Sequence, residues 1–208
     1  MRKRGHLYTE SCSAFRLFNS GGDGIPGLVI DRYGEYLLIQ IFEEKVVPDK
    51  EKIFESVLSV IAGLPVVPKG ILYKRRDETA SSQKEYRSEL VWGDMPERNY
   101  LVTQSGVTAA VNLVEGLNTA LFLDMRNVRN ELSELYTSGM ESMLNLFCYT
   151  GMFSVHALRN GLKRCCNVDI SGTVLRRAKE NYCINGLRVD NRDFICEDSG
   201  VFLKKAAS

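Results

Sequence analysis

LNLFCYTGMFSV, residues 144–155, is the stretch that decides the fold of the second half of this chain. Leu146 and Phe147 end an apolar run typical of a buried strand, and Thr150 and Gly151 then interrupt it. Apolar residues return at helical spacing after the glycine. A strand, a tight turn containing glycine and a helix are typical of α/β proteins that hold a nucleotide-like ligand beyond the carboxyl end of the strand.

The sequence around this stretch alternates between strand and helix patterns from about residue 121. Predicted strands cover residues 142–147, 163–168 and 193–197, and predicted helices cover residues 128–136, 152–160 and 171–184, with a further helix from about residue 199. This alternation predicts an α/β fold with a parallel, doubly wound sheet and right-handed crossovers.

The first half of the chain has a different texture, with short strand patterns between turn signals. Strands are expected at residues 28–30, 36–42, 71–73, 101–102 and 107–114, and a helix is expected from residues 48–49 to Gly63. We therefore expect a small α+β domain over residues 1–115 and a second domain over residues 116–208.

Composition limits the class of protein but not its partner. The net charge is +1, so any nucleic-acid-binding face must be local, and Lys74, Arg75 and Arg76 form one such basic cluster. That cluster is equally typical of a solvated surface. The six cysteines show no C-x-x-C spacing and there are only two histidines, so we expect no metal site. No signal peptide or apolar run of the ~20 residues needed to span a bilayer is visible, which predicts a cytoplasmic protein without a membrane partner.

Two carboxylates follow the second and third predicted strands. Asp169 is placed to accept hydrogen bonds from the ribose hydroxyls of an adenosine, and Asp198 from its exocyclic amine. Either residue could instead cap the helix that follows it. A dinucleotide pyrophosphate would require a G-x-G-x-x-G loop, whereas Tyr149 and Met152 occupy positions that would need to be small. An adenosine without phosphates fits better, which predicts S-adenosylmethionine.

Four segments together resemble a known family. The segments LNLFCYTGMFSVHAL and NVDISGTVLRRAKENYCINGL are similar to the cofactor-binding half of class I S-adenosylmethionine-dependent methyltransferases. More closely, the chain resembles the bacterial 23S ribosomal RNA large-subunit methyltransferases that modify cytosine C5 or guanine N7. GLNTALFLDMRNVR resembles their T-G-x-F-L-D-x-R stretch, with Ala120 where glycine is usual. FRLFNSGGDGIPGLVIDRYGEYLLIQ resembles their central α/β domain, which helps to hold RNA.

The resemblance implies a Rossmann-like domain with S-adenosylmethionine as cofactor and ribosomal RNA as partner. The residues it assigns to the cofactor are Phe122, Asp124, Arg126, Asn145, Phe147, Tyr149, Thr150, Gly151, Asp169, Ile170 and Asp198. Within this set, Arg126 would pair with the cofactor carboxylate and Ile170 would flank the adenine. Lys74, Arg75 and Arg76 could contact RNA phosphates.

The family pattern also includes a fourth strand that ends in an Asp/Asn-Pro-Pro-like turn, and no proline follows Pro96 here. We therefore expect a fragment with three of the family's strands, inactive alone, whose catalytic residues lie elsewhere. Without a fourth strand, the strand at residues 142–147 would have an open edge suited to a second copy or a complementing chain. The alternative is a non-catalytic RNA-binding remnant or split-protein half. Cys148 is interpreted as a packing residue rather than a nucleophile.

Overall fold

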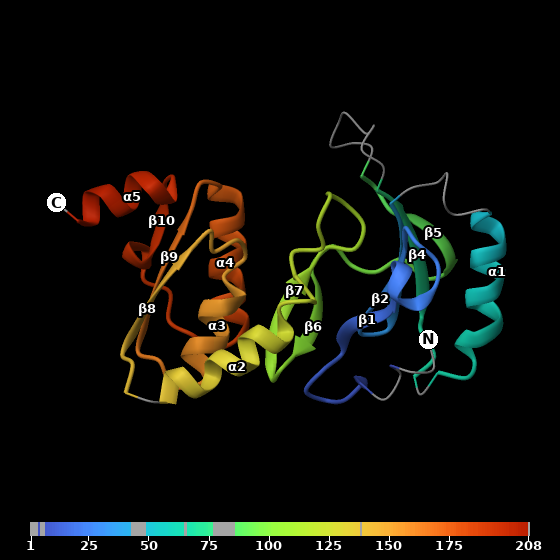
Figure 1. Ribbon diagram of the computed structural model, residues 1–208, viewed down its shortest axis with the longest axis horizontal. Helices are drawn as coiled ribbons and strands as arrows, with labels where there is room; N and C mark the ends of the chain where they lie inside the picture. The colour runs from blue at the N-terminus through green and yellow to red at the C-terminus, as the bar shows by residue number, and fades with distance from the viewer. Residues whose placement is uncertain are drawn as a thin grey trace. The chain divides into compact units, whose positions relative to one another are not determined.

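The computed structural model describes residues 4, 7–42, 49–64, 66–76, 86–137 and 139–207 (Figure 1). The chain divides into two compact units. The first comprises Met1–Gly106 and Val111–Thr119, and the second comprises Val107–Ala110 and Ala120–Ser208. The division after Thr119 lies four residues beyond the boundary expected from the sequence, and a short upstream segment also belongs to the second unit.

The first unit contains a five-stranded sheet with the order β1-β2-β3-β4-β5 (Figure 1). All neighbours are antiparallel except β3 and β4, which are parallel. Helix α1 lies between these two strands in the sequence, and its N-cap Asp49 accepts hydrogen bonds from the Glu51 and Lys52 main-chain N–H groups. The bounds are β1 Ala14–Asn19, a 3-10 helix at Ser20–Asp23, β2 Leu28–Tyr33, β3 Tyr36–Ile41, α1 Lys50–Ile61, β4 Gly70–Arg75 and β5 Glu89–Gly93.

The apolar core of this unit lies on one face of the sheet. Val57 and Ile61 of α1 pack there with side chains from β1 to β4, including Leu37, Ile39 and Ile71, which have no exposed surface. Burial of such side chains is the main favourable term in folding. The sheet is therefore anchored by the helix that makes its parallel crossover.

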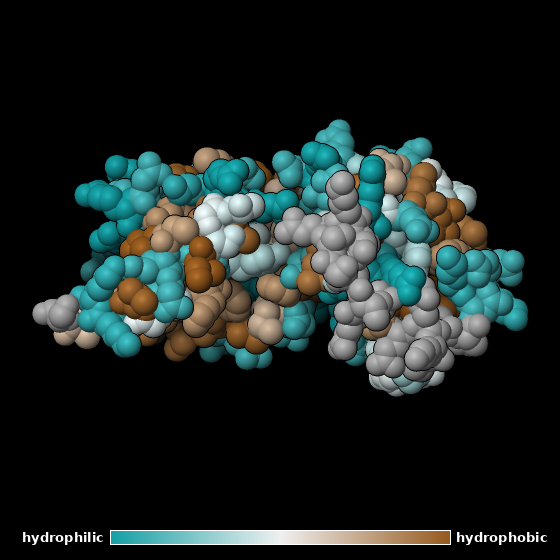
Figure 2. Space-filling view, turned by 90° about the horizontal axis from the view of Figure 1, so that it is seen from above, coloured by the Kyte–Doolittle hydropathy of each residue, from teal (hydrophilic) through white to brown (hydrophobic). Residues whose placement is uncertain are grey.

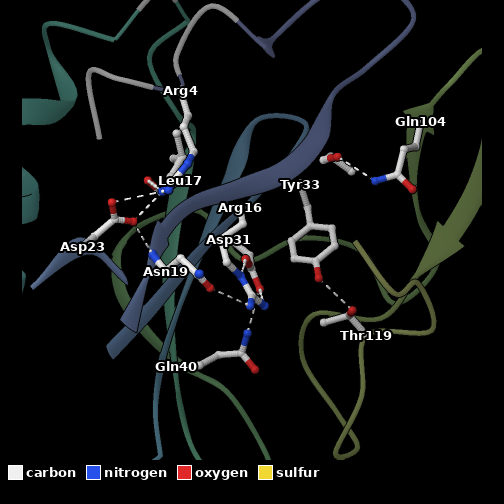
Figure 3. A network of polar contacts seen from close by, with 11 residues as sticks. Arg4, Arg16, Leu17, Asn19, Asp23, Asp31, Tyr33, Gln40, Gln104 and Thr119 are labelled. Atoms are coloured by element: carbon white, nitrogen blue, oxygen red, sulfur yellow. Dashed lines mark hydrogen bonds and ion pairs between the residues drawn. The ribbon is translucent and has the colours of Figure 1, made fainter. Parts of the chain in front are cut away.

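The other face of the sheet carries a buried polar network (Figure 3). Asp31 is 1% exposed, and its carboxylate accepts hydrogen bonds from Arg16 Nε at 2.8 Å and from Gln40 Nε2 at 3.0 Å. Tyr33 and Thr119 are joined through their hydroxyl groups at 2.8 Å. A buried carboxylate is stable only when it is paired and hydrogen-bonded, so these partners are needed to keep Asp31 inside.

The second unit contains a parallel three-stranded sheet with the order β10-β9-β8, as the alternating sequence pattern predicts. Among the described residues, β8 pairs with β9 on one side only, and Leu144 on β8 is 43% exposed. The bounds are α2 Arg126–Thr137, β8 Ser142–Leu146, α3 Met152–Arg159, β9 Arg164–Asp169, α4 Gly172–Ile184, a 3-10 helix at Asn191–Asp193, β10 Phe194–Cys196 and α5 Ser199–Ala206.

Strands β6 (Tyr100–Gln104) and β7 (Val107–Val111) form a separate two-stranded sheet. Two asparagines of α4 hold β7 through its main chain. Asn181 Oδ1 accepts from the Ala110 N–H at 3.0 Å, and Asn185 both accepts from the Thr108 N–H and donates to the Thr108 carbonyl. These bonds explain why residues 107–110 belong to the second unit. In the part of the chain that the structure describes, no helix is long and apolar enough to cross a membrane.

Candidate functional site

The loop after β8 has an unusual backbone. Phe147, Tyr149 and Gly151 have φ angles of 54°, 51° and 72°, in the left-handed region that residues other than glycine rarely adopt. A Cβ atom on Gly151 would lie 2.9 Å from the Cβ of Ala178 on α4. The backbone angle therefore favours glycine here, and the close packing of the loop on α4 leaves no room for a Cβ atom without a shift.

Asp169 ends β9 beside this loop. Its Oδ2 accepts a hydrogen bond from the Tyr149 N–H at 2.9 Å, and its Oδ1 accepts from the Ser171 N–H at 2.9 Å. Each carboxylate oxygen can accept about two hydrogen bonds, so both retain capacity for a ligand hydroxyl. The capping and ligand-binding interpretations of Asp169 are thus compatible.

Large apolar side chains are exposed near the same edge of the sheet. Phe147 at the end of β8 is 76% exposed and Ile170 after β9 is 74% exposed. Phe122 is also exposed, and its ring lies 5.0 Å from that of Tyr149. Figure 2 shows hydrophobic side chains of this kind on the surface among hydrophilic ones. Apolar side chains beside a few aimed polar groups are typical of sites that hold a flat heterocycle.

The segment before α2 is tied to the loop. The Thr150 hydroxyl donates to the Ala120 carbonyl at 2.7 Å, and Ala120 has a φ of 71°, in the region that favours glycine. Asp124 is exposed and Arg126 is half-buried at the start of α2. This brings the first three predicted cofactor residues into the same unit as the loop.

Arg129 was not assigned a role from the sequence, but it supports this segment. The residue is 2% exposed, and its guanidinium donates to the Phe122 carbonyl at 3.3 Å and lies 5.5 Å from the centre of the Phe153 ring. Burial lowers the pKa of Arg129 to about 10, and Asp124 opposes that effect. Only its position one turn into the helix, facing inward, could have identified it.

A chain of buried polar side chains connects β8, α3, β9 and α4. Asn145 donates to the Ser154 hydroxyl at 2.9 Å, Ser154 donates to Asn167 Oδ1 at 2.7 Å, and Asn167 donates to the Tyr182 hydroxyl at 2.8 Å. Ser154 and Asn167 have no exposed surface. The amide of Asn145 is thus used internally, while its Oδ1 has no partner among the described residues. We infer that Asn145 orients the strand as well as facing the candidate site.

Asp198 is the N-cap of α5, with Oδ1 accepting from the N–H groups of Gly200 and Val201 at 2.9 and 3.0 Å. Its Oδ2 has no hydrogen bond to a described residue.

Cys148 is buried, and burial raises the pKa of its thiol to about 12. A protonated, buried thiol is a poor nucleophile, in agreement with a packing role. Among the described residues, no group of three or more histidine, cysteine or acidic side chains could hold a metal ion.

The expected surface position of Lys74 is wrong. Lys74 lies on β4, an internal strand, has no exposed surface and donates to the Gly116 carbonyl at 2.9 Å. Burial, and then the nearby Arg76, lower its pKa to about 8. Arg76 donates to the Leu117 carbonyl, and Arg75 is exposed at the end of the strand. Two of the three basic residues therefore hold the segment after β7 instead of extending into solvent.

Comparison with known proteins agrees with this geometry. The family model of S-adenosylmethionine-dependent methyltransferases matches residues 16–204. The chain is 33% identical over 198 residues to "Putative ribosomal RNA large subunit methyltransferase YwbD" of Bacillus subtilis, covering 95% of this chain and 48% of that protein. It is 32% identical to ribosomal RNA large subunit methyltransferase I of Aeromonas salmonicida, covering 91% and 46%. The chain thus spans about half the length of the curated relatives it matches.

Two solved structures of putative methyltransferases match the fold. One, from Streptococcus mutans, has a TM-score of 0.82 at 28% identity, covering 99% of this chain and 52% of that one. The other, complexed with SAH, has a TM-score of 0.81 at 27% identity, covering 99% and 51%. The family match and the site geometry agree on S-adenosylmethionine as the cofactor. This chain belongs to the S-adenosylmethionine-dependent methyltransferase family.

Proposed function

We propose that this chain is part of a methyltransferase that transfers a methyl group from S-adenosylmethionine to large-subunit ribosomal RNA. The observation that carries the proposal is the position of Asp169, whose carboxylate holds the Tyr149 N–H and keeps acceptor capacity at the carboxyl edge of the sheet. The names of the curated relatives support RNA as the substrate.

We propose that Asp169 binds the ribose hydroxyls, that Ile170 flanks the adenine and that Asp198 accepts from its exocyclic amine through Oδ2. Phe147, Tyr149, Thr150 and Gly151 would form the loop beneath the ribose and methionine portions, with Asn145 supporting it. Phe122 and Asp124 would lie over the cofactor, and Arg126 would pair with its carboxylate. The exposure of Phe147 and Ile170 supports this assignment, because ligand binding would cover both.

The bound cofactor would supply an activated methyl group on sulfur. The residues of this chain would hold that methyl group in line with an acceptor atom of a base turned out of its stack, so catalysis would rest on positioning. Cytosine C5 and guanine N7 are the two acceptor atoms to test. With Lys74 buried and Arg76 donating to the Leu117 carbonyl, Arg75 is the exposed member of the basic cluster that we propose for phosphate contacts. Three expectations stay predictions. They are that this stretch is inactive alone, that a partner binds the edge of β8 that does not pair with β9, and that the protein is cytoplasmic.

Isothermal titration calorimetry with S-adenosylmethionine tests the cofactor part of the proposal. We expect one site per chain, and no heat with NAD, because the loop lacks the glycines that a pyrophosphate needs. RNA binding without S-adenosylmethionine binding would favour the alternative, a non-catalytic RNA-binding piece. Binding of NAD in preference to S-adenosylmethionine would contradict the assignment of the loop.

A further inference from the structure

A second concave site lies in the methyltransferase unit, at the opposite end of β9 from the cofactor edge. It is a cleft of about 510 Å³, lined by the start of β9, the end of α3 and the segment between α4 and β10. Arg164 at the start of β9 and Asp169 at its end are separated by five residues, or about 16 Å of extended strand. The cleft is therefore separate from the candidate cofactor site.

The lining of the cleft carries an excess of positive charge. Four cations, Lys163, Arg164, Arg188 and Arg192, face two carboxylates, Asp190 and Asp193, which gives the lining a net charge of +2, and Lys163 also pairs with Glu141 outside the lining. The whole chain has a net charge of only +1, so the excess is local. The guanidinium side chains of Arg164 and Arg192 are 64% and 82% exposed, while the side chains of Asp193 and Asp190 are 17% and 25% exposed. The cations are thus the groups that meet an incoming ligand.

Each of the two carboxylates binds one edge of an arginine guanidinium group, the edge formed by Nε and Nη2. Asp193 accepts from Arg164 Nε at 2.8 Å and lies 2.6 Å from its Nη2. Asp190 accepts from Nε and Nη2 of Arg192. In both arginines the Nη1 group has no hydrogen bond to a described residue. A guanidinium oriented in this way presents its remaining N–H groups in a fixed direction, which suits a phosphate.

Arg188 lines the cleft and has no hydrogen bond or ion pair with any described residue. The hydrogen bonds from Arg192, and to a smaller extent the charge of nearby Arg188, lower the pKa of the Asp190 carboxyl. The lining also includes apolar side chains, among them Leu158, Leu162 and Leu187. Cationic and apolar side chains around one cleft fit a nucleotide whose phosphate meets the arginines while its base lies on the leucines.

We propose that this cleft binds a single-stranded segment of the RNA substrate, about 16 Å or more from the base that is methylated. This inference rests on the proposed function for the identity of the ligand. Its role would be to place the RNA by phosphate contacts that carry no sequence information.

The test is fluorescence anisotropy of a labelled single-stranded RNA of about 20 nucleotides with the full chain, between about 50 and 200 mM salt. Arg188→Glu is expected to weaken binding about tenfold or more, and Arg188→Ala to lower the slope of log affinity against log salt by about 0.7. Arg192→Lys keeps the charge but loses the guanidinium, which can bind Asp190 at one edge and a phosphate at the other. It should therefore weaken RNA binding and leave the slope of log affinity against log salt unchanged. Arg176→Glu on α4, outside the cleft, is the matched charge-reversal control. Its loss of RNA affinity should be no greater than that of Arg188→Ala.

Equal affinity and slope for Arg188→Glu and Arg176→Glu would overturn the inference, and so would the absence of RNA binding by the unchanged chain. Calorimetry with S-adenosylmethionine on the same samples separates this result from the proposed function. If cofactor binding persists in all variants while the arginine changes have no effect on RNA, the cleft assignment fails and the methyltransferase assignment stands.

Discussion

The carboxylate of Asp169 and the main-chain N–H of Tyr149 are joined by a hydrogen bond of 2.9 Å between the ends of two neighbouring strands. One side chain thus both shapes the loop and forms part of the proposed ribose site. Loss of its charge should weaken cofactor binding and also cost stability, because Asp169 accepts two internal hydrogen bonds and each bond to a charged group contributes about 1.5–3 kcal/mol.

We predict that Asp169→Asn weakens S-adenosylmethionine binding at least about tenfold and that Asp169→Ala weakens it further, since the amide retains one acceptor and alanine none. Calorimetry measures the affinity, and urea denaturation reports whether the fold is retained. Asp190→Asn, which changes a carboxylate in the opposite cleft, is the control. Unchanged cofactor affinity in Asp169→Ala would remove this residue from the site.

Gly151 and Ala178 lie in close contact, so we predict that substitutions at these two positions have non-additive effects on the unfolding free energy. Gly151→Ala places a Cβ 2.9 Å from that of Ala178 and also requires alanine at a φ of 72°. The expected loss is about 1–3 kcal/mol of unfolding free energy, together with weaker cofactor binding. In the double variant with Ala178→Gly the clash is relieved but the backbone strain remains, so part of the interaction energy should be recovered. Strict additivity in urea denaturation would show that the contact does not matter.

Ala120 is predicted to be a site of simple stabilisation. It is fully buried with a φ of 71°, and its carbonyl accepts from Thr150, so the backbone cannot easily relax. Ala120→Gly should raise the unfolding free energy by about 0.5–1 kcal/mol, since glycine adopts this conformation without the steric cost. The control is Ala157→Gly in α3, where the same change should cost about 1 kcal/mol. A destabilised Ala120→Gly variant would show that the lost methyl group contributes more than the backbone strain costs.

The sequence predicted the second unit well because its strands and helices alternate regularly. Strand β9 and helix α4 begin and end within about one residue of the expected bounds, and Asp169 lies at the predicted strand end. Strands β1 and β5 of the first unit were not predicted, because a charge interrupts the apolar residues of AFRLFN and only three apolar residues stand between Glu89 and Gly93 in ELVWG. The burial of Lys74 could not be predicted from its neighbours, since the carbonyl that accepts from its ammonium group belongs to Gly116, 42 residues later in the chain.

Buried Lys74 predicts a pH-dependent stability. Burial lowers its pKa to about 8, whereas an unfolded lysine has a pKa of about 10.4. Below about pH 8 both states hold the proton, and the folded state bears the full cost of burying the charge. Between about pH 8 and 10.4 the unfolded state binds more protons, so the contribution of Lys74 to folding stability becomes more favourable as the pH rises.

Tyrosines and cysteines that stay protonated when buried lose protons in this pH range once the chain unfolds. The comparison must therefore be with Lys74→Met, which removes the charge at similar volume. We expect the unfolding free energy of the unchanged protein, relative to that of Lys74→Met, to increase by about 1–2 kcal/mol between pH 7.5 and 9.5 in urea denaturation. Lys52→Met changes an exposed lysine of α1 and should show no such trend relative to the unchanged protein. The difference in unfolding free energy between the unchanged protein and Lys74→Met could instead stay constant over this pH range. That result would mean that Lys74 keeps its proton throughout, because water reaches its ammonium group.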